Sequence, residues 1–240
     1  MTTAHAKGIS LRFKIRASAA SQIMTNDRSG KGMGETCKTY LRNWILEQPE
    51  FLNRRVNEFS SQYTSKGNAV ERDSLDFIGR MLYDGAFFEP NTDFFSDNFK
   101  TGTPDIIHDI HLDDNKSSWS AKSFPFFDTE PAKAYWWQGQ VYMNLTGRKK
   151  YNVIHTLMNT PEPLIKSESY RVARELGFSE PTDEIYESCV ARLTFDDLPD
   201  NRRIKVFSFD YDPTAIDALE KRVEECRTFI YNTLILIDEA

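Results

Sequence analysis

Three charged residues stand close together in a stretch that is otherwise rich in isoleucine and leucine. Asp105 follows a proline, and Asp114 and Lys116 lie two positions apart in GTPDIIHDIHLDDNKSSW, residues 102–119. Charges are costly to bury unless they are paired or bind a metal. The stretch is therefore either a surface hairpin with an ion pair between Lys116 and Asp114 or a site at which three charged groups converge.

A chain turn near residues 108–110 would bring the three groups together. Side chains alternate in direction along a strand, so Asp114 and Lys116 point the same way. The strand that begins at Asp105 would run antiparallel to the one that ends at Lys116, with Asp105 opposite Asp114. Two carboxylates so close repel each other unless a cation lies between them. Hard oxygen ligands favour Mg²⁺ or Mn²⁺, and a lysine beside a metal-bound water can orient that water for phosphodiester hydrolysis.

Two histidines in the same stretch carry a different expectation. His108 and His111 are three positions apart. That spacing places side chains on one face of a helix but not on one face of a strand. We therefore interpret both as turn residues and not as metal ligands.

The elements that must position the charged residues alternate between helical and extended patterns. Helices are expected at residues 18–24, 35–48, 68–82, 131–146, 170–176 and 182–192 and from 212 onward. Strands are expected at residues 85–90, 92–99, 104–119, 149–159 and 202–210. This order predicts an α/β or α+β protein with a mixed sheet and helices on both of its sides.

The composition bounds the class of protein. With 240 residues, 40% of them hydrophobic, the chain is long enough for one large domain, which we expect to span residues 1–240. No run approaches the roughly 18 apolar residues of a membrane span, and the N-terminus lacks the apolar core of a signal peptide. We therefore expect a cytoplasmic protein with no membrane partner. Three widely spaced cysteines without a CxxC pair argue against a disulfide framework and against a thiolate metal site.

Charge is distributed unevenly along the chain. The net charge of −6 argues against a protein covered by nucleic acid over its whole surface. Residues 1–34 nevertheless carry six lysines and arginines against one acid, Asp27. A local basic face on an acidic body suits an enzyme that binds an anion at one place, although a solvated charge pattern without a partner explains it equally well.

Four blocks of the sequence together resemble the lambda-exonuclease family of viral recombination nucleases, within the PD-(D/E)xK nuclease superfamily. The blocks are IRASAASQIM, KGNAVERDSLDFI, the pair GTPDII and DDNKSSW, and AYWWQGQVYM. They resemble, in the family's order, a Thr-Ala-Ser helix start, a Gly…Glu helix, a metal-binding hairpin and a Gln-x-Gln helix. The resemblance implies a restriction-endonuclease-like fold, with a mixed β-sheet flanked by helices, for most of the chain.

The resemblance implies a catalytic role for each matching residue of the hairpin. Asp105 and Asp114 would be metal ligands, the backbone carbonyl of Asn115 would be a third, and Lys116 would position the attacking water. Two positions depart from the family pattern. Asp114 stands where Glu is more frequent, and Asn115 stands where an apolar residue is usual, but neither change removes a catalytic group.

Two further residues of the implied site lie on helices. Glu71 would complete the metal site from the opposite side, and Gln138 would approach it from the helix after the hairpin. The alternatives are an exposed helical glutamate for Glu71 and a polar residue on a half-buried helix face for Gln138.

The family also binds the 5′ phosphate of DNA in a small basic pocket. The matching positions here are Arg12, Ser18, Thr103 and Lys122. Arginine suits a phosphate because its planar fork makes charge-assisted hydrogen bonds. The match at Arg12 needs a one-residue gap, so Arg16 or Arg28 is an alternative.

The resemblance thus implies a Mg²⁺-dependent 5′→3′ exonuclease, with Mn²⁺ as a substitute ion, acting on one strand of linear duplex DNA. It would leave 3′ single-stranded overhangs for phage-type recombination, in the host cytoplasm if the protein is viral. Its implied partners are double-stranded DNA ends, a single-strand annealing protein and two further copies in a trimeric ring. The alternatives are a structure-specific or restriction-type endonuclease of the same fold and a non-catalytic DNA-end-binding protein. The complete set of acidic residues and lysine argues against the last.

Overall fold

The computed structural model describes residues 2–52 and 61–239, and helices and strands alternate along them. The helices are α1 (Thr3–Leu11), α2 (Ala20–Ile23), α3 (Glu35–Leu46), α4 (Gln62–Leu82), α5 (Lys133–Thr146), α6 (Glu162–Glu175), α7 (Asp183–Leu193) and α8 (Pro213–Glu239). The strands are β1 (Ile15–Arg16), β2 (Phe95–Ser96), β3 (Lys100–Gly102), β4 (Ile106–Ile107), β5 (His111–Ser117), β6 (Lys150–Thr156) and β7 (Ile204–Asp210). Short 3₁₀ helices are η1 (Ala17–Ala19), η2 (Ala121–Ser123) and η3 (Asp200–Arg202). In this described part of the chain, no helix combines the length and the apolar character that crossing a membrane requires.

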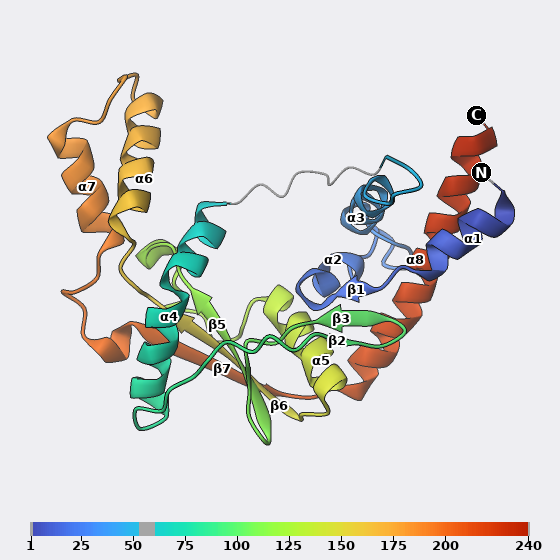
Figure 1. Cartoon of the computed structure of the whole chain (residues 1–240), viewed down its shortest axis with the longest axis horizontal. Helices are drawn as coiled ribbons and strands as arrows, with labels where there is room; N and C mark the ends of the chain where they lie inside the picture. The colour runs from blue at the N-terminus through green and yellow to red at the C-terminus, as the bar shows by residue number, and fades with distance from the viewer. Residues whose placement is uncertain (1, 53–60, 240) are drawn as a thin grey trace.

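The strands form two sheets (Figure 1). The larger sheet has the order β4-β5-β6-β7, in which β5 and β6 are parallel and both outer pairs are antiparallel. The smaller sheet has the order β1-β3-β2, with β1 parallel and β2 antiparallel to β3. Helix α5 connects β5 to β6 and supplies the crossover that a parallel pair needs. The mixed sheet with helices that the sequence predicts is confirmed.

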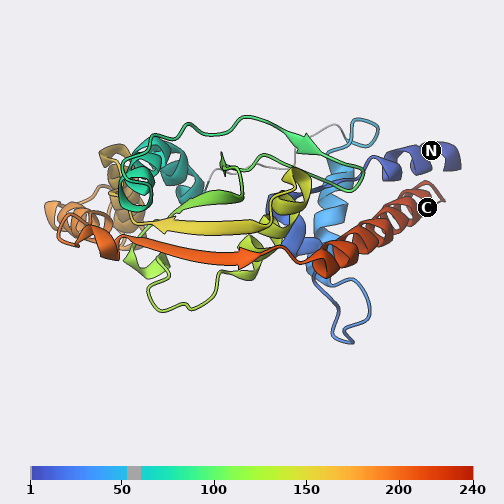
Figure 2. The same ribbon diagram turned by 90° about the horizontal axis from the view of Figure 1, so that it is seen from below.

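Helices α4 and α5 pack against opposite faces of the larger sheet. Alternation along β5 directs Asp114 and Lys116 to one face and Asn115 to the other. Asp114 accepts a hydrogen bond from Gln138 of α5, whereas Asn115 accepts one from Ser74 of α4. Both Figure 1 and Figure 2 show α6 and α7 at one end of the molecule and α1 and α8 at the other.

A glycine allows α5 to approach the sheet closely. A Cβ at Gly139 would lie 2.6 Å from a ring carbon of Tyr151 and 2.7 Å from one of Phe209. The buried core formed there combines residues of the sheet with residues of α5, namely Leu112, Tyr151, Val153, Val141 and Met143. Because α5 carries Gln138 beside this glycine, the same packing fixes the distance of Gln138 from the charged hairpin.

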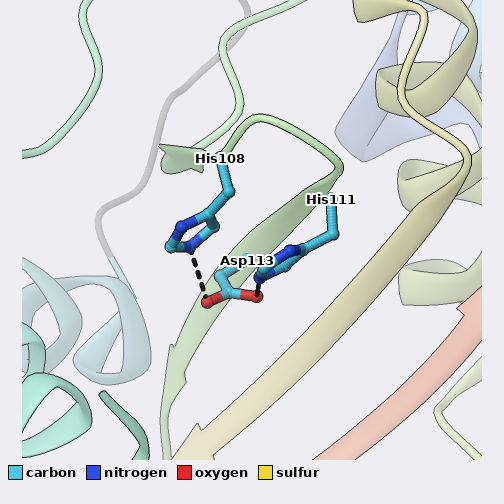
Figure 3. Close-up of side chains that lie close together, drawn as sticks. All are labelled: His108, His111 and Asp113. Atoms are coloured by element: carbon cyan, nitrogen blue, oxygen red, sulfur yellow. Dashed lines mark hydrogen bonds and ion pairs between the residues drawn. The ribbon is translucent and has the colours of Figure 1, made fainter. Parts of the chain in front are cut away.

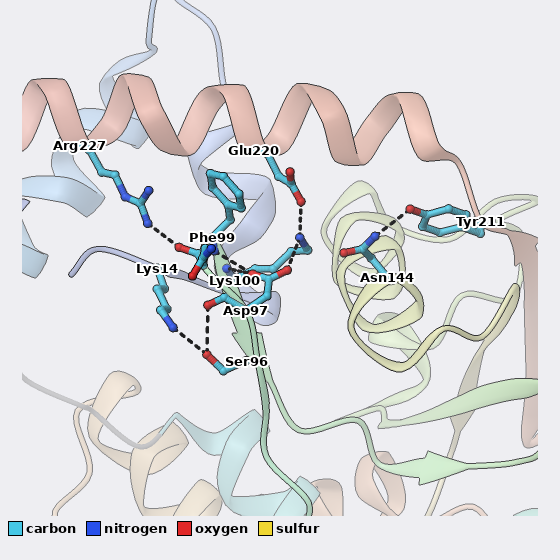
Figure 4. Close-up of polar contacts among 10 residues, drawn as sticks. Lys14, Ser96, Asp97, Phe99, Lys100, Asn144, Tyr211, Glu220 and Arg227 are labelled. Atoms are coloured by element: carbon cyan, nitrogen blue, oxygen red, sulfur yellow. Dashed lines mark hydrogen bonds and ion pairs between the residues drawn. The ribbon is translucent and has the colours of Figure 1, made fainter. Parts of the chain in front are cut away.

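The C-terminal helix α8 holds the smaller sheet (Figure 4). Lys100 of β3 is fully buried, and its ammonium pairs with Asp97 at 2.6 Å and with Glu220 of α8 at 2.5 Å. Arg227 of α8 donates to the carbonyl of Phe13, just before β1, at 3.0 Å. These contacts attach the N-terminal segment and the β2–β3 hairpin to one helix.

Two helices are longer than the sequence predicts. Helix α4 extends N-terminally beyond residue 68, and Ser61 caps it by accepting a hydrogen bond from the N–H of Thr64 at 3.2 Å. Helix α6 begins well before residue 170. Pro163 lies in its first turn, where a missing N–H removes no intrahelical hydrogen bond.

The strand expected at residues 85–90 is not formed, and these described residues lie in irregular backbone. Pro90 has no N–H to give to a sheet. The N–H of Asn91 instead donates to the carbonyl of Asp105 at 2.8 Å. Phe87 is 63% exposed, and the guanidinium of Arg72 lies 3.7 Å from its ring centroid. The aromatic run therefore covers the outside of α4 instead of joining the sheet.

Candidate active site

The β4–β5 hairpin brings Asp105 and Asp114 together. The two strands are antiparallel, with Ile106 opposite Asp113. One further step in this register puts Asp105 opposite Asp114. The backbone N–H of Asn115 donates to Oδ2 of Asp105 at 2.9 Å. The facing pair of carboxylates that side-chain alternation predicts is thus present.

Lys116 pairs with Asp114 inside the molecule and not on its surface. Its Nζ lies 2.6 Å from Oδ2 of Asp114, which is fully buried, while the lysine side chain is 23% exposed. Gln138 Nε2 donates to the other oxygen, Oδ1, at 3.3 Å. Among the described residues, the ammonium of Lys116 is the cation that Oδ2 faces. A buried carboxylate is stabilised by such a positive charge or by a metal ion.

The electrostatics of the hairpin also favour a cation. Burial, together with the carboxylate of Asp114, raises the pKa of Asp105 to about 7. Burial alone would lower the pKa of Lys116, but Asp114 and Asp105 outweigh it and raise that pKa above its ordinary value. Burial and Asp114 raise the pKa of Tyr142 to about 12. Each shift reflects negative charge concentrated in a low-dielectric site, which a divalent cation would neutralise.

Glu71 of α4 lies within electrostatic range of Asp105. Ser74, one turn after Glu71, donates to Oδ1 of Asn115 at 2.9 Å and lies 2.5 Å from the hydroxyl of Thr156. Glu71 is exposed and contributes through its charge to the raised pKa of Asp105. The carboxylates of Asp105, Asp114 and Glu71 and the carbonyl of Asn115 are all hard oxygen donors, so this set fits Mg²⁺ or Mn²⁺.

Three solved structures share this arrangement of elements over nearly the whole chain. A phage-related exonuclease from Haemophilus somnus 129PT superposes with a TM-score of 0.75 at 23% identity, covering 94% of this chain and 96% of that one. The alkaline exonuclease of Laribacter hongkongensis, alone and in complex with dAMP, superposes with a TM-score of 0.60 at 14% identity, covering 98% and 96%. The fold is that of these exonucleases. No protein-family model matches the chain, and a search of curated proteins found no match.

In this exonuclease fold, Ser18 and Thr103 come from adjoining segments. Ser18 lies in η1, directly after β1, and Thr103 directly follows β3, the parallel neighbour of β1. A Cβ at Gly102 would lie 3.1 Å from the Cβ of Ala17, which shows how closely the two segments approach. Both Ser18 and Thr103 are exposed.

The two basic residues expected in the phosphate pocket lie on other elements. Arg12 caps the C-terminus of α1 and pairs with Glu50 at 2.8 Å. Lys122 is exposed in η2. Arg16, the alternative to Arg12, is exposed in β1 opposite Thr101, next to the Ser18 and Thr103 segments. The role of all of these residues in binding phosphate stays a prediction.

A cavity of about 490 Å³ adjoins Lys116 in the exonuclease fold, and the sequence did not indicate it. Its lining includes Tyr63, Trp119, Tyr135 and His155. The Lys116 ammonium lies 5.4 Å from the ring centroid of Tyr135. Burial, with the neighbouring Lys116, lowers the pKa of His155 to about 4, so this imidazole is neutral at neutral pH.

The helical spacing of residues around Gln138 predicts part of the lining of this cavity. Tyr135 stands three residues before Gln138, and Tyr142 four residues after it, so the three share one face of α5. Gln138 Nε2 donates to the hydroxyl of Tyr142 at 3.3 Å. His155 has no such local signal, because only the parallel pairing of β5 and β6 sets it beside Lys116.

The expectation that His108 and His111 do not lie on one face of the sheet was wrong. Both imidazoles approach Asp113 (Figure 3): His108 Nε2 lies 3.0 Å from Oδ2, and His111 Nε2 lies 3.4 Å from Oδ1. The N–H of His108 donates to the carbonyl of His111 at 3.0 Å, so the two residues flank the hairpin turn. Residues across a turn share a face of the sheet, whatever their spacing along one strand.

Proposed function

We propose that this chain is a metal-dependent deoxyribonuclease that hydrolyses phosphodiester bonds. The observation that supports this is the convergence of Asp105, Asp114 and Lys116 in one hairpin of a fold shared with exonucleases. Asp105, Asp114, Glu71 and the carbonyl of Asn115 would hold the ion. When bound, Mg²⁺ or Mn²⁺ supplies positive charge that polarises the phosphate and acidifies water.

The protein's own residues orient the reactants. The raised pKa of Lys116 keeps its side chain an ammonium, which donates hydrogen bonds but accepts no proton. Lys116 therefore orients the attacking water and stabilises negative charge that develops on the phosphate. Gln138 fixes the carboxylate of Asp114 through its hydrogen bond to Oδ1.

We further propose that the enzyme digests one strand of linear duplex DNA in the 5′→3′ direction and leaves 3′ overhangs. The four sequence blocks that resemble lambda-type exonucleases support this polarity, and the structures that share the fold support exonuclease activity in general. Ser18, Thr103 and Lys122 would bind the 5′ phosphate together with Arg16, because Arg12 is engaged by Glu50.

The biological setting belongs to the same proposal. The overhangs would serve a single-strand annealing protein in phage-type recombination in the host cytoplasm, and residues 1–240 would act as one nuclease domain. Three copies would close into a ring around DNA. Light scattering at working concentrations tests the ring, and a monomer there contradicts it.

The deciding experiment compares linear duplex DNA labelled at one 5′ end with covalently closed circular DNA, with and without Mg²⁺. We expect release of the label from linear DNA only, dependent on Mg²⁺ or Mn²⁺, with Ca²⁺ supporting binding but not cleavage. Cutting of the closed circle would instead indicate an endonuclease. Binding of ends without cleavage in any of these ions would indicate a non-catalytic end-binding protein.

A further inference from the structure

A second cluster of metal-ligating side chains lies on the face of β5 that points away from the proposed nuclease site. Asp113 and Asp114 are adjacent in β5, so their side chains point to opposite faces of the sheet. Asp113 is fully buried, whereas His108 and His111 are 18% and 17% exposed. Nitrogen atoms of both imidazoles and an oxygen of Asp113 lie within 4.8 Å of one another.

We propose that His108, His111 and Asp113 form a binding site for a transition-metal ion of the zinc type. Two imidazoles and one carboxylate are a donor set that zinc accepts, in contrast to the all-oxygen set around Asp114. In a tetrahedral site with bonds of about 2.0–2.1 Å, neighbouring ligand atoms lie about 3.4 Å apart. His108 Nε2 lies 3.0 Å from Oδ2 of Asp113 and His111 Nε2 lies 3.4 Å from Oδ1, so a small shift brings both nitrogen atoms to this spacing from one carboxylate oxygen.

Neighbouring residues hold the carboxylate in place. Tyr83 donates its hydroxyl hydrogen to Oδ2 of Asp113, and Asn152 Nδ2 donates to Oδ1 at 2.7 Å. Hydrogen bonds of this kind fix and tune metal ligands. Asp113 is thus oriented by Asn152 of β6 and by Tyr83, the residue after α4, whose hydroxyl also lies 3.1 Å from Nε2 of His111.

The imidazoles must separate slightly to bind one ion. Their rings are stacked, with centroids 4.1 Å apart and an angle of 14° between the planes. Nearly parallel rings do not point their nitrogen atoms at a common centre, so one ring has to rotate about its side-chain bonds. That rotation would replace ring contacts, since Tyr83 stacks on both imidazoles, and water would complete the coordination from the partly exposed side of the histidines.

The ion would connect the two strands of the hairpin. His108 follows β4, whereas His111 and Asp113 belong to β5, so a common ion joins the two sides of the turn. The same two strands carry Asp105 and Asp114 on the other face. Because it binds the folded hairpin, the ion would stabilise the folded state by an amount that grows with the logarithm of the free ion concentration above Kd. This metal site does not depend on the proposed nuclease activity and can be present even if the protein is not a nuclease.

Calorimetric titration of the tag-free protein with Zn²⁺ tests this site. All measurements start from Asp114→Asn, which disables the carboxylate pair on the other face. We expect one bound ion in this background. Adding His108→Gln or His111→Gln should raise the Kd for Zn²⁺ at least tenfold. Adding His5→Gln, which changes an exposed side chain of α1, should leave this Kd within twofold. Absence of binding, or equal Kd in all variants, would show that the cluster is only a hydrogen-bonded cap of Asp113.

Two further measurements keep the proposal testable if a histidine variant folds poorly. Co²⁺ bound to Asp114→Asn should give the strong visible absorption of a four-coordinate ion, and a weak six-coordinate spectrum would overturn the proposal. Zn²⁺ should raise the Tm of Asp114→Asn and not that of its His108→Gln derivative. An equal rise in both proteins would place the ion elsewhere.

Discussion

Lys116 is half-buried yet remains charged, because Asp114 and Asp105 outweigh the effect of burial on its pKa. Its ammonium lies between the buried carboxylate of Asp114 and the cavity lined by Tyr135 and His155. In the proposed mechanism, a fixed positive charge at this position would orient water and stabilise an anionic transition state. The raised pKa fits such an electrostatic task and not that of a proton acceptor.

The first prediction concerns this charge. Lys116→Met should lower the cleavage rate on linear duplex DNA by about 10²–10³-fold, the typical cost of losing one preorganised donor to developing charge. Binding of DNA in Ca²⁺ should change little, since the site's oxygen ligands remain. Lys221→Met, on the exposed side of α8, is the matched control and should keep full activity. A cleavage rate of Lys116→Met within tenfold of wild type would show that Lys116 does not have the proposed catalytic role.

The second prediction concerns the pH dependence of the metal-free protein. The pKa of Asp105 is about 7 in the folded state, above the value of about 3.9 for an unperturbed aspartate. The folded state therefore binds this proton more tightly than the unfolded chain. The associated stability is fully present below about pH 4 and is lost as the pH rises through about 7.

Melting curves in EDTA between pH 5 and pH 8 measure this effect. We expect the Tm of wild type to fall with rising pH more steeply than that of Asp105→Asn, which has no proton to lose at this position. Mg²⁺ should flatten the wild-type profile, because it neutralises the carboxylate pair. Parallel profiles for the two proteins without metal would show that Asp105 titrates in its ordinary range.

At the scale of elements, the site depends on α4 and α5 being held against opposite faces of one sheet. Helix α4 is attached by the hydroxyl contacts of Ser74 with Asn115 and Thr156. It is also attached by Lys66, fully buried, whose ammonium donates to the carbonyl of Ser118 at 2.7 Å. Helix α5 is held by close apolar packing around Gly139 and also by hydrogen bonds, among them one from Gln140 Nε2 to the carbonyl of Asp210 at 2.9 Å. The close approach at Gly139 is the feature of α5 that a single added methyl group would disturb.

The third prediction compares two glycines of these helices. Gly139→Ala should destabilise the protein by about 1–3 kcal/mol, because its Cβ would overlap the rings of Tyr151 and Phe209. Gly67→Ala in α4, whose Cβ would meet no described heavy atom within 4 Å, should stabilise it by about 0.4–1 kcal/mol. Urea unfolding measures both. A neutral Gly139→Ala would mean that α5 can move away from the sheet.

At the scale of the whole molecule, residues from distant parts of the sequence would meet at the DNA end. Ser18 lies in the N-terminal segment that α8 holds through Phe13, whereas Thr103 follows the β2–β3 hairpin that α8 holds through Lys100. The proposed phosphate pocket therefore depends on the anchoring of both segments by one C-terminal helix.

The fourth prediction concerns the chemistry of the DNA end. Duplex DNA with a 5′ phosphate should be degraded about 10- to 150-fold faster than the same DNA with a 5′ hydroxyl, at subsaturating DNA. This corresponds to one charge-assisted contact of roughly 1.5–3 kcal/mol that aligns the scissile bond. Arg16→Ala should reduce the preference without abolishing cleavage, and Arg12→Ala, whose side chain pairs with Glu50, should reduce it less.

Combining a change of the DNA end with a substitution in the protein distinguishes loss of the phosphate pocket from a general loss of DNA affinity. The effects of Arg16→Ala and of the missing phosphate should not add, because both remove the same interaction. Equal rates of wild type on the two ends would mean that no such pocket operates. A larger effect of Arg12→Ala than of Arg16→Ala would restore Arg12 to the phosphate site.

Much of the hairpin that carries Asp105 and Asp114 could be predicted from the sequence because its geometry is local. Side chains alternate with period two along a strand, so one turn between Asp105 and Asp114 suffices to set them opposite each other. The helices that carry Glu71 and Gln138 follow equally from periodic apolar residues. In each case the decisive interactions connect residues within one element or across one turn.

Tertiary structure alone decided the rest. The pairing of His108 with His111 follows from the same hairpin register as that of Asp105 with Asp114, whereas His155 reaches Lys116 only through parallel strand pairing. The engagement of Arg12 by Glu50 joins residues far apart in sequence. Such contacts depend on how helices and strands pack against one another, and this packing is determined by the side chains of several elements at once. The periodicity of residues within one segment therefore does not predict these contacts.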